Sequence, residues 1–293
     1  MIRCRQLAGR VAALSLGIFT IACLPGVTSA AAPDREAQNQ PHKPFQIYGN
    51  TYYVGTAGLA SVLVTSEYGH VLVDTGLPET APLIANSIQE LGFELDDVKA
   101  IVFSHAHLDH VGGAAELQRL TGAQVYALRP AESALLTGKL PKEDPQAAAK
   151  SKAIPKVERV WIVTDGQLLG VGGVRVRVHA TPGHTPGSAT WAWDACEGSK
   201  CLEFVYADSL SPVSAGKYRF KDHQEALAGF EQSFTLLESM PCQILMVPHP
   251  DAALLAKLEA AKGNPDALTD DAACKRFAQQ RRDDLQKKLG EER

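Results

Sequence analysis

Four residues of the types that bind metal ions stand within six positions of the chain: His105, His107, Asp109 and His110. Imidazole nitrogens bind zinc, copper, iron and nickel, and a carboxylate adds a hard oxygen ligand. Four such ligands are more than one tetrahedral ion readily uses. The run therefore predicts a centre for two metal ions rather than a chance group of polar residues.

Two further histidines have a similar setting. His184 lies in a turn rich in proline and glycine, residues 181–188, and His249 lies between Pro248 and Pro250. Each directly follows an apolar stretch that reads as a strand, so each imidazole would be held at a strand end. We therefore predict that both are metal ligands. Four histidines lack such a setting, and we do not expect them to bind metal: His42, His70, His179 and His223. Of these, His223 lies beyond a possible pocket loop.

The elements that position these residues follow from the pattern of apolar residues. Strands are predicted at 45–54, 60–66, 70–74, 99–103, 124–128, 157–163, 174–180, 188–194, 201–206 and 243–247. Helices are predicted at 78–91, 111–120, 222–239 and over most of 251–293. Strands followed by a helix, twice over, indicate an α/β protein whose two halves pack sheet to sheet with helices outside. Residues 130–155 form a longer irregular segment, which we expect to lie as a loop over a site.

Composition limits the classes of function. The chain has 293 residues, of which 45% are hydrophobic, and a formal net charge of −4. This is enough apolar material for a full hydrophobic core. The near-neutral net charge gives no indication of nucleic-acid binding. We expect residues 33–293 to form one domain that acts as a monomer on a small molecule.

The first 32 residues have the pattern of a signal peptide. Basic residues precede an apolar run at 11–24, which is followed by small residues at 28–32, so cleavage after Ala30 or Ala32 is expected. The apolar run is shorter than the ~20 residues that span a bilayer, which argues against an anchor. A lipoprotein site at Cys23 is an alternative. From the signal peptide we expect a periplasmic protein that is not attached to the membrane after cleavage.

Four cysteines remain after the leader: Cys196, Cys201, Cys242 and Cys274. An even number in an exported protein favours disulfides, and three pairings are possible. Cys196 and Cys201 flank a turn-like Glu-Gly-Ser-Lys string, so a bridge between them is sterically easy. That bridge leaves Cys242 to pair with Cys274. No two of them show C-x-x-C spacing, which argues against zinc-thiolate ligands.

The histidine run, the His184 turn and Asp74 at a predicted strand end together resemble the metallo-β-lactamase superfamily, from about residue 45 to 250. The resemblance implies an αβ/βα four-layer sandwich, with two mixed sheets and helices outside. It does not specify one substrate, because the superfamily also includes glyoxalase II-like thioesterases, lactonases, nucleases and sulfatases.

A finer resemblance is to subclass B3 of the metallo-β-lactamases. It rests on residues 58–59, 77–79, 184–188, 206–211 and 248–250 and on the Cys242/Cys274 pair. It implies two zinc ions, the first held by His105, His107 and His184 and the second by Asp109, His110 and His249. Ser209 stands where related enzymes carry a cysteine, and the resemblance implies that Ser209 and Ser211 hold the substrate carboxylate.

The function so implied is that of a zinc-dependent β-lactamase. It would hydrolyse the β-lactam amide of penicillins, cephalosporins and carbapenems by a zinc-bound hydroxide, which Asp109 would orient while Asp74 braces the site. The alternative is another secreted dinuclear zinc hydrolase, a lactonase or a thioesterase, in which Asp208 would bridge the two metals. A third alternative is a metal-binding protein without turnover.

Overall fold

The computed structural model describes residues 35–262 and 264–292. The signal peptide predicted over residues 1–32 and the lipoprotein site at Cys23 lie outside these residues and stay predictions. Within the described part of the chain, no helix combines the length and the apolar character that a membrane span requires.

The first sheet is mixed and contains seven strands in the order of the sequence. They are β1 (Phe45–Tyr48), β2 (Thr51–Tyr53), β3 (Val62–Val64), β4 (His70–Val73), β5 (Val98–Val102), β6 (Gln124–Leu128) and β7 (Val160–Val163). β1 to β4 are antiparallel and β4 to β7 are parallel. β4 and β5 are almost entirely buried, as expected for parallel strands that are covered on both faces. The strand predicted at 45–54 is in fact a hairpin, β1 and β2, because Gly49 turns the chain with a φ of 52°.

The second sheet has five strands in the order β12-β11-β10-β9-β8. They are β8 (Leu168–Val171), β9 (Val174–Ala180), β10 (Ala189–Glu197), β11 (Lys200–Tyr206) and β12 (Ile244–Met246). Only β12 is parallel to its neighbour, so this sheet is mixed as well. Sequence reasoning missed β8, a short edge strand that pairs only with β9 and holds a single buried residue, Leu169.

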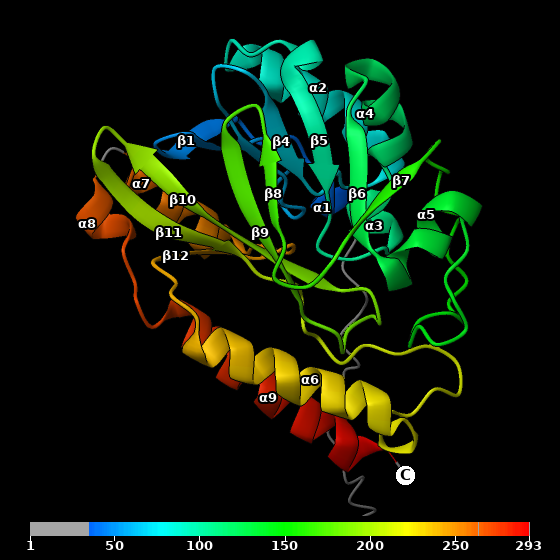
Figure 1. Ribbon diagram of the computed structural model, residues 1–293. Coiled ribbons are helices and arrows are strands. Elements are labelled where there is room, and N and C mark those ends of the chain that lie inside the picture. The colour runs from blue at the N-terminus through cyan, green and yellow to red at the C-terminus, as the bar shows by residue number, and fades with distance from the viewer. Residues whose placement is uncertain (1–34, 263, 293) are drawn as a thin grey trace, which may run out of the picture. The chain divides into compact units, whose positions relative to one another are not determined.

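The α-helices of the described residues are α1 (Arg35–Gln38), α2 (Ala81–Glu90), α3 (Leu108–Val111), α4 (Ala114–Thr121), α5 (Glu132–Thr137), α6 (Gln224–Ser239), α7 (Ala252–Ala260), α8 (Pro265–Leu268) and α9 (Ala273–Glu291). α2 and α4 cover the outer face of the first sheet, and α6 and α9 cover the outer face of the second (Figure 1). Leu255 and Leu258 of α7 and Leu268 of α8 instead belong to the core between the sheets. Separate apolar cores lie between the two sheets, between the first sheet and α2 and α4, and between the second sheet and α6 and α9. Three cores separate four layers, which confirms the predicted αβ/βα sandwich.

Both predicted disulfides are present. Cys196–Cys201 joins two residues that face each other across β10 and β11. Cys242–Cys274 ties the segment before β12 to the first turn of α9. The second bridge therefore fixes the long C-terminal helix to the sheet that carries His249.

Candidate metal centre

The predicted ligands lie where strands of the two sheets end. The His105 run follows β5, with Asp109 and His110 in the first turn of α3 rather than before a helix at 111–120. The link between α3 and α4 lies tightly on the turn after β4, because a Cβ on Gly113 would lie 2.4 Å from the carbonyl oxygen of Thr75. His184 follows β9 from the second sheet. Its turn packs on α6, since a Cβ on Gly183 would lie 2.5 Å from the ring of Phe230.

The six residues gather into two groups of three, and within each group the ligand atoms lie within 4.8 Å of one another. We call these the first triad (His105, His107 and His184) and the second triad (Asp109, His110 and His249). All three imidazoles of the first triad are buried. In the second triad only His110 is buried, and the side chains of Asp109 and His249 are 32% and 39% exposed.

Each imidazole of the first triad has an acceptor at its other ring nitrogen. Nδ1 of His105 forms a hydrogen bond of 3.2 Å with the hydroxyl of Ser104. It also lies 2.9 Å from Oδ1 of buried Asp208, an oxygen that has no hydrogen-bond partner of favourable geometry among the described residues. Nε2 of His107 lies 3.1 Å from both carboxylate oxygens of Asp144. Nδ1 of His184 lies 2.7 Å from the carbonyl oxygen of Ser211. Such partners fix the orientation of metal-binding histidines and leave the opposite nitrogen free for the ion.

Asp74 braces the second triad. Its carboxylate accepts hydrogen bonds from the backbone N–H and the hydroxyl of Ser104, both at 2.7 Å, and from the hydroxyl of Tyr206 at 2.9 Å. Oδ2 of Asp74 also lies 3.2 Å from Nδ1 of His110. The backbone of Asp74 has a φ of 56°, which non-glycine residues rarely adopt. Its side chain therefore links the ends of β4, β5 and β11 to one ligand.

The unengaged nitrogens of the second triad converge. Nε2 of His110 lies 3.1 Å from Nε2 of His249, and Oδ2 of Asp109 lies 3.4 Å from each of these nitrogens. Two ring nitrogens that face each other beside a carboxylate can share a proton or a metal ion. This donor set of two nitrogens and one oxygen suits a borderline divalent ion such as zinc.

Burial and mutual repulsion keep most of these imidazoles neutral, which is the form that binds metal. Burial lowers the pKa of His184 to about 3 and that of His249 to about 4, and it lowers the pKa of His105 as well. His110 differs. Burial acts to lower its pKa, but the carboxylates of Asp109 and Asp74 outweigh burial and raise the pKa to about 10. The two carboxylates therefore favour a positive charge at His110.

Asp208 belongs to neither triad. Its Oδ1 lies 2.9 Å from Nδ1 of His105, and its Oδ2 accepts a hydrogen bond from the backbone of Leu210. This position fits a brace behind His105 better than the bridge between two metals that the thioesterase alternative requires.

Hollows lie on both sides of the triads. One, of about 470 Å³, is lined by His249, Ser209 and Ser211, and the buried hydroxyl of Ser209 has no hydrogen-bond partner among the described residues. The other, of about 430 Å³, is lined by His107, Asp109 and residues of the segment 138–154. The irregular segment thus lies over the site as predicted. Its contacts from Asp144 and Gln146 were missed, because no local pattern marks which residue of a loop turns inward.

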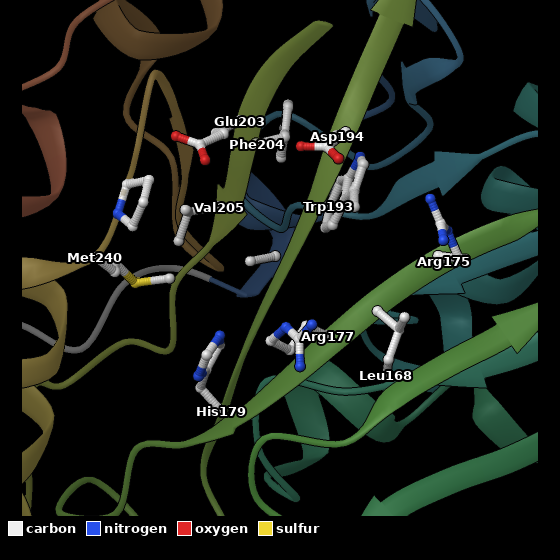
Figure 2. Close-up of a pocket in the computed structure, with 12 residues that line it drawn as sticks. Leu168, Arg175, Arg177, His179, Trp193, Asp194, Glu203, Phe204, Val205 and Met240 are labelled. Atoms are coloured by element: carbon white, nitrogen blue, oxygen red, sulfur yellow. The ribbon is translucent and has the colours of Figure 1, made fainter.

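A third hollow, of about 460 Å³, lies away from the triads on the second sheet (Figure 2). Figure 2 shows Arg175, Arg177 and His179 along β9, with Asp194 and Glu203 on the neighbouring strands. None of the six predicted ligands lines it. The other histidines have ordinary settings: His42 bonds a backbone carbonyl, His70 packs on Phe93 and His223 stacks on Tyr218.

Comparisons with known proteins agree with this geometry. Residues 55–195 match the sequence pattern of the Metallo-beta-lactamase superfamily, a span that includes every predicted ligand except His249. The structure is similar to Rm3 metallo-beta-lactamase, with 44% identity, a TM-score of 0.84, and 88% of this chain and 97% of that chain covered. It is similar to the metallo-beta-lactamase SMB-1, solved with mercaptoacetic acid, with 42% identity, a TM-score of 0.83, and coverage of 87% and 99%.

MEM-A1, a subclass B3 metallo-beta-lactamase isolated from a soil metagenome library, is 41% identical, with a TM-score of 0.82 and coverage of 86% of this chain and 97% of that chain. Among curated proteins, the hydroxyacylglutathione hydrolase of Rhodopseudomonas palustris (strain BisB18) is 30% identical over 141 residues, which are 48% of this chain and 46% of that protein. The chain spans about half the length of the curated relatives that it matches. Because the likeness to the lactamases extends over nearly their whole length, the chain belongs to the metallo-β-lactamase superfamily and is similar within it to subclass B3.

Proposed function

We propose that this protein is a zinc-dependent β-lactamase that hydrolyses the amide bond of penicillins, cephalosporins and carbapenems. The observation that carries the proposal is the pair of adjacent triads, in a chain more than 40% identical to three metallo-β-lactamases. Similar lactamases share the fold along nearly their full length, whereas the thioesterases match only about half of theirs.

The donor set supports two zinc ions. His105, His107 and His184 would hold one ion through three nitrogens, and the second triad would hold the other through two nitrogens and a carboxylate. Zinc takes three protein ligands at catalytic sites and leaves a further position open. When bound, zinc lowers the pKa of water from about 15.7 to about 7 and polarises a carbonyl oxygen.

The chain's own residues orient the reactants. Asp109 is the one carboxylate of the triads. Its partial exposure lets it accept a hydrogen bond from a water molecule in the hollow that it lines with His107. It would thereby align that water with the lactam carbonyl.

Ser209, whose hydroxyl has no hydrogen-bond partner in the described structure, would donate a hydrogen bond to the substrate carboxylate next to the lactam nitrogen. Ser211 lines the same hollow as Ser209 and would assist, while its backbone holds His184.

We also propose that the enzyme acts in the periplasm. A signal peptide over residues 1–32 would direct it to the periplasm, where disulfides such as Cys242–Cys274 persist. There it would act as a monomer on antibiotics before these reach their targets.

A thioesterase is the second candidate, because curated relatives include hydroxyacylglutathione hydrolases. The position of Asp208 behind His105, outside both triads, argues against this candidate.

The test is hydrolysis of a carbapenem and a cephalosporin by the purified mature protein, followed as loss of lactam absorbance. We expect turnover that a zinc chelator abolishes and added zinc restores. Glutathione thioesters and lactones are tested in parallel. Turnover of one of these without any β-lactam hydrolysis, in protein shown to hold zinc, would assign the rival activity. Full activity after removal of the metal would reject both.

A further inference from the structure

The segment between α5 and β7, residues 138–159, closes over the first triad, and we call it the strap. It has no helix or strand, yet backbone hydrogen bonds hold it at both ends, from Ile154 to Gly138 and from Val157 to Leu135, each at 3.1 Å. Near its middle, the carbonyl oxygen of Pro145 accepts a hydrogen bond of 2.9 Å from Ala215. The strap is therefore fixed in place, and its inward side chains have defined positions.

Asp144 is the inward-facing carboxylate of the strap. Its side chain is only 3% exposed, and both of its oxygens lie 3.1 Å from Nε2 of His107. Turns of the strap hold this carboxylate, because Oδ1 accepts a hydrogen bond of 2.7 Å from the backbone of Gln146 and the Asp144 N–H donates to Pro141. A buried carboxylate so closely held is costly unless it has a partner, and His107 is that partner.

The contact decides which nitrogen of His107 can bind a metal. A carboxylate only accepts hydrogen bonds, so Nε2 must carry the proton that lies between the two groups. The lone pair then resides on Nδ1. That nitrogen lies on the side of Gln146, whose Nε2 is 3.4 Å away and which lines the hollow beside the first triad. Since Asp144 engages Nε2, Nδ1 is the nitrogen of His107 that is left to bind a metal ion at the first triad.

The strap and the loop after Ser209 support each other. The loop holds His184 through the carbonyl of Ser211, and it meets the strap through the bond between Ala215 and Pro145. A Cβ on Gly216 would lie 2.9 Å from Cβ of Ala148, so the two segments touch closely there. Two of the three ligands of the first triad are therefore braced by segments that are joined to each other.

We propose that Asp144 is a positioning residue that fixes the tautomer and the orientation of His107, so that the strap contributes to metal affinity at the first triad. The inference rests on the proposed function only in taking zinc as the ion. It does not depend on which substrate is hydrolysed.

Three variants test it in the zinc-loaded protein. Asp144→Ala removes the acceptor, Asp144→Asn keeps the shape but offers one weaker acceptor oxygen, and Glu143→Gln removes the neighbouring exposed carboxylate as a matched control. Zinc affinity is measured by competition with a chromophoric chelator. Loss of such a partner typically weakens metal affinity by about 10–100-fold. We expect that loss for one of the two ions in Asp144→Ala, a smaller loss in Asp144→Asn and none in Glu143→Gln.

Two further readouts separate positioning from a general loss of structure. The visible spectrum of the cobalt-substituted protein should change in both Asp144 variants and not in the control, while the melting temperature of Asp144→Asn stays near that of the wild type. In the zinc-loaded wild type, NMR of the His107 ring should show the proton on Nε2. A proton on Nδ1 would overturn the proposal without any variant, as would wild-type zinc affinity in Asp144→Asn with an unchanged cobalt spectrum. Normal zinc binding without β-lactam turnover would reject the proposed function and leave this inference standing.

Discussion

The two triads are built from similar ligands but differ in enclosure. The first triad is entirely imidazole and buried, and a carboxylate or a carbonyl backs each ring. In the second, Asp109 and His249 are partly exposed, and the brace from Asp74 reaches only His110. The first triad is therefore preorganised to bind a metal ion tightly. The second is open to substrate and should exchange its metal ion more readily.

The cause of this difference lies in the elements that carry the ligands. The first triad draws on the end of β5 and on a turn that is packed against α6, and the strap covers it. His249 instead follows β12 in a short proline-flanked segment that borders a hollow. The backbone of Gly58 is its hydrogen-bond partner away from the triad. Position in the fold, rather than ligand type, thus separates the two sites.

The largest effect is expected from His184→Ala, which breaks the enclosed triad. Loss of a ligand there removes metal-assisted charge stabilisation worth several kcal/mol, so kcat should fall by about 10²–10⁴-fold. Metal content, measured by atomic emission after dialysis, should fall below two zinc ions per chain. Two retained ions with normal kcat would show that His184 is not a ligand.

His249→Ala breaks the open triad and should have a smaller effect. We expect one zinc ion to be retained at the first triad, with affinity close to that of the wild type, and kcat to fall by roughly 10–10²-fold. Stoichiometry and chelator competition measure the two ions separately. If His249→Ala lost both ions while His184→Ala lost one, the ranking of the two triads would be reversed.

Asp74→Asn tests the carboxylate that braces His110 in the second triad. The amide can no longer accept from all of its donors, Ser104, Tyr206 and His110. Affinity for the second ion should fall by about 10–100-fold. The free energy of unfolding should fall by about 1–3 kcal/mol, because a buried donor loses its acceptor. Denaturant melts and chelator competition check the two effects, and a loss confined to the first ion would contradict the assignment.

The smallest effect is expected from Ser209→Ala, on the open side of the centre. Its buried hydroxyl has no hydrogen-bond partner in the part of the chain that the structure describes, so stability should change little. A lost hydrogen bond to the substrate carboxylate should raise KM by about tenfold, with zinc content unchanged. A change in metal content in place of KM would show that Ser209 acts on the second triad rather than on substrate.

Much of the candidate centre could be predicted from local sequence. His105, His107, Asp109 and His110 are recognisable because ligand types are dense within one short run, and His184 and His249 because each follows an apolar stretch. The helix boundary was less accurate, since α3 begins at Leu108 and not at residue 111. The edge strand β8 escaped detection because it is short and barely buried.

Local sequence was enough to predict the ligand types and the layered α/β class. It favoured one of three cysteine pairings, because a bridge between Cys196 and Cys201 is sterically easy. The grouping and bracing of the ligands depend on the tertiary structure. His110 and His249 meet across 139 positions of sequence, and Asp144 reaches His107 across 37. Side-chain direction within a loop depends on what packs around it, and that packing exists only once both sheets have come together. This is why a run of histidines indicates a metal centre from sequence, whereas the contact between Asp144 and His107 is found only in the folded structure.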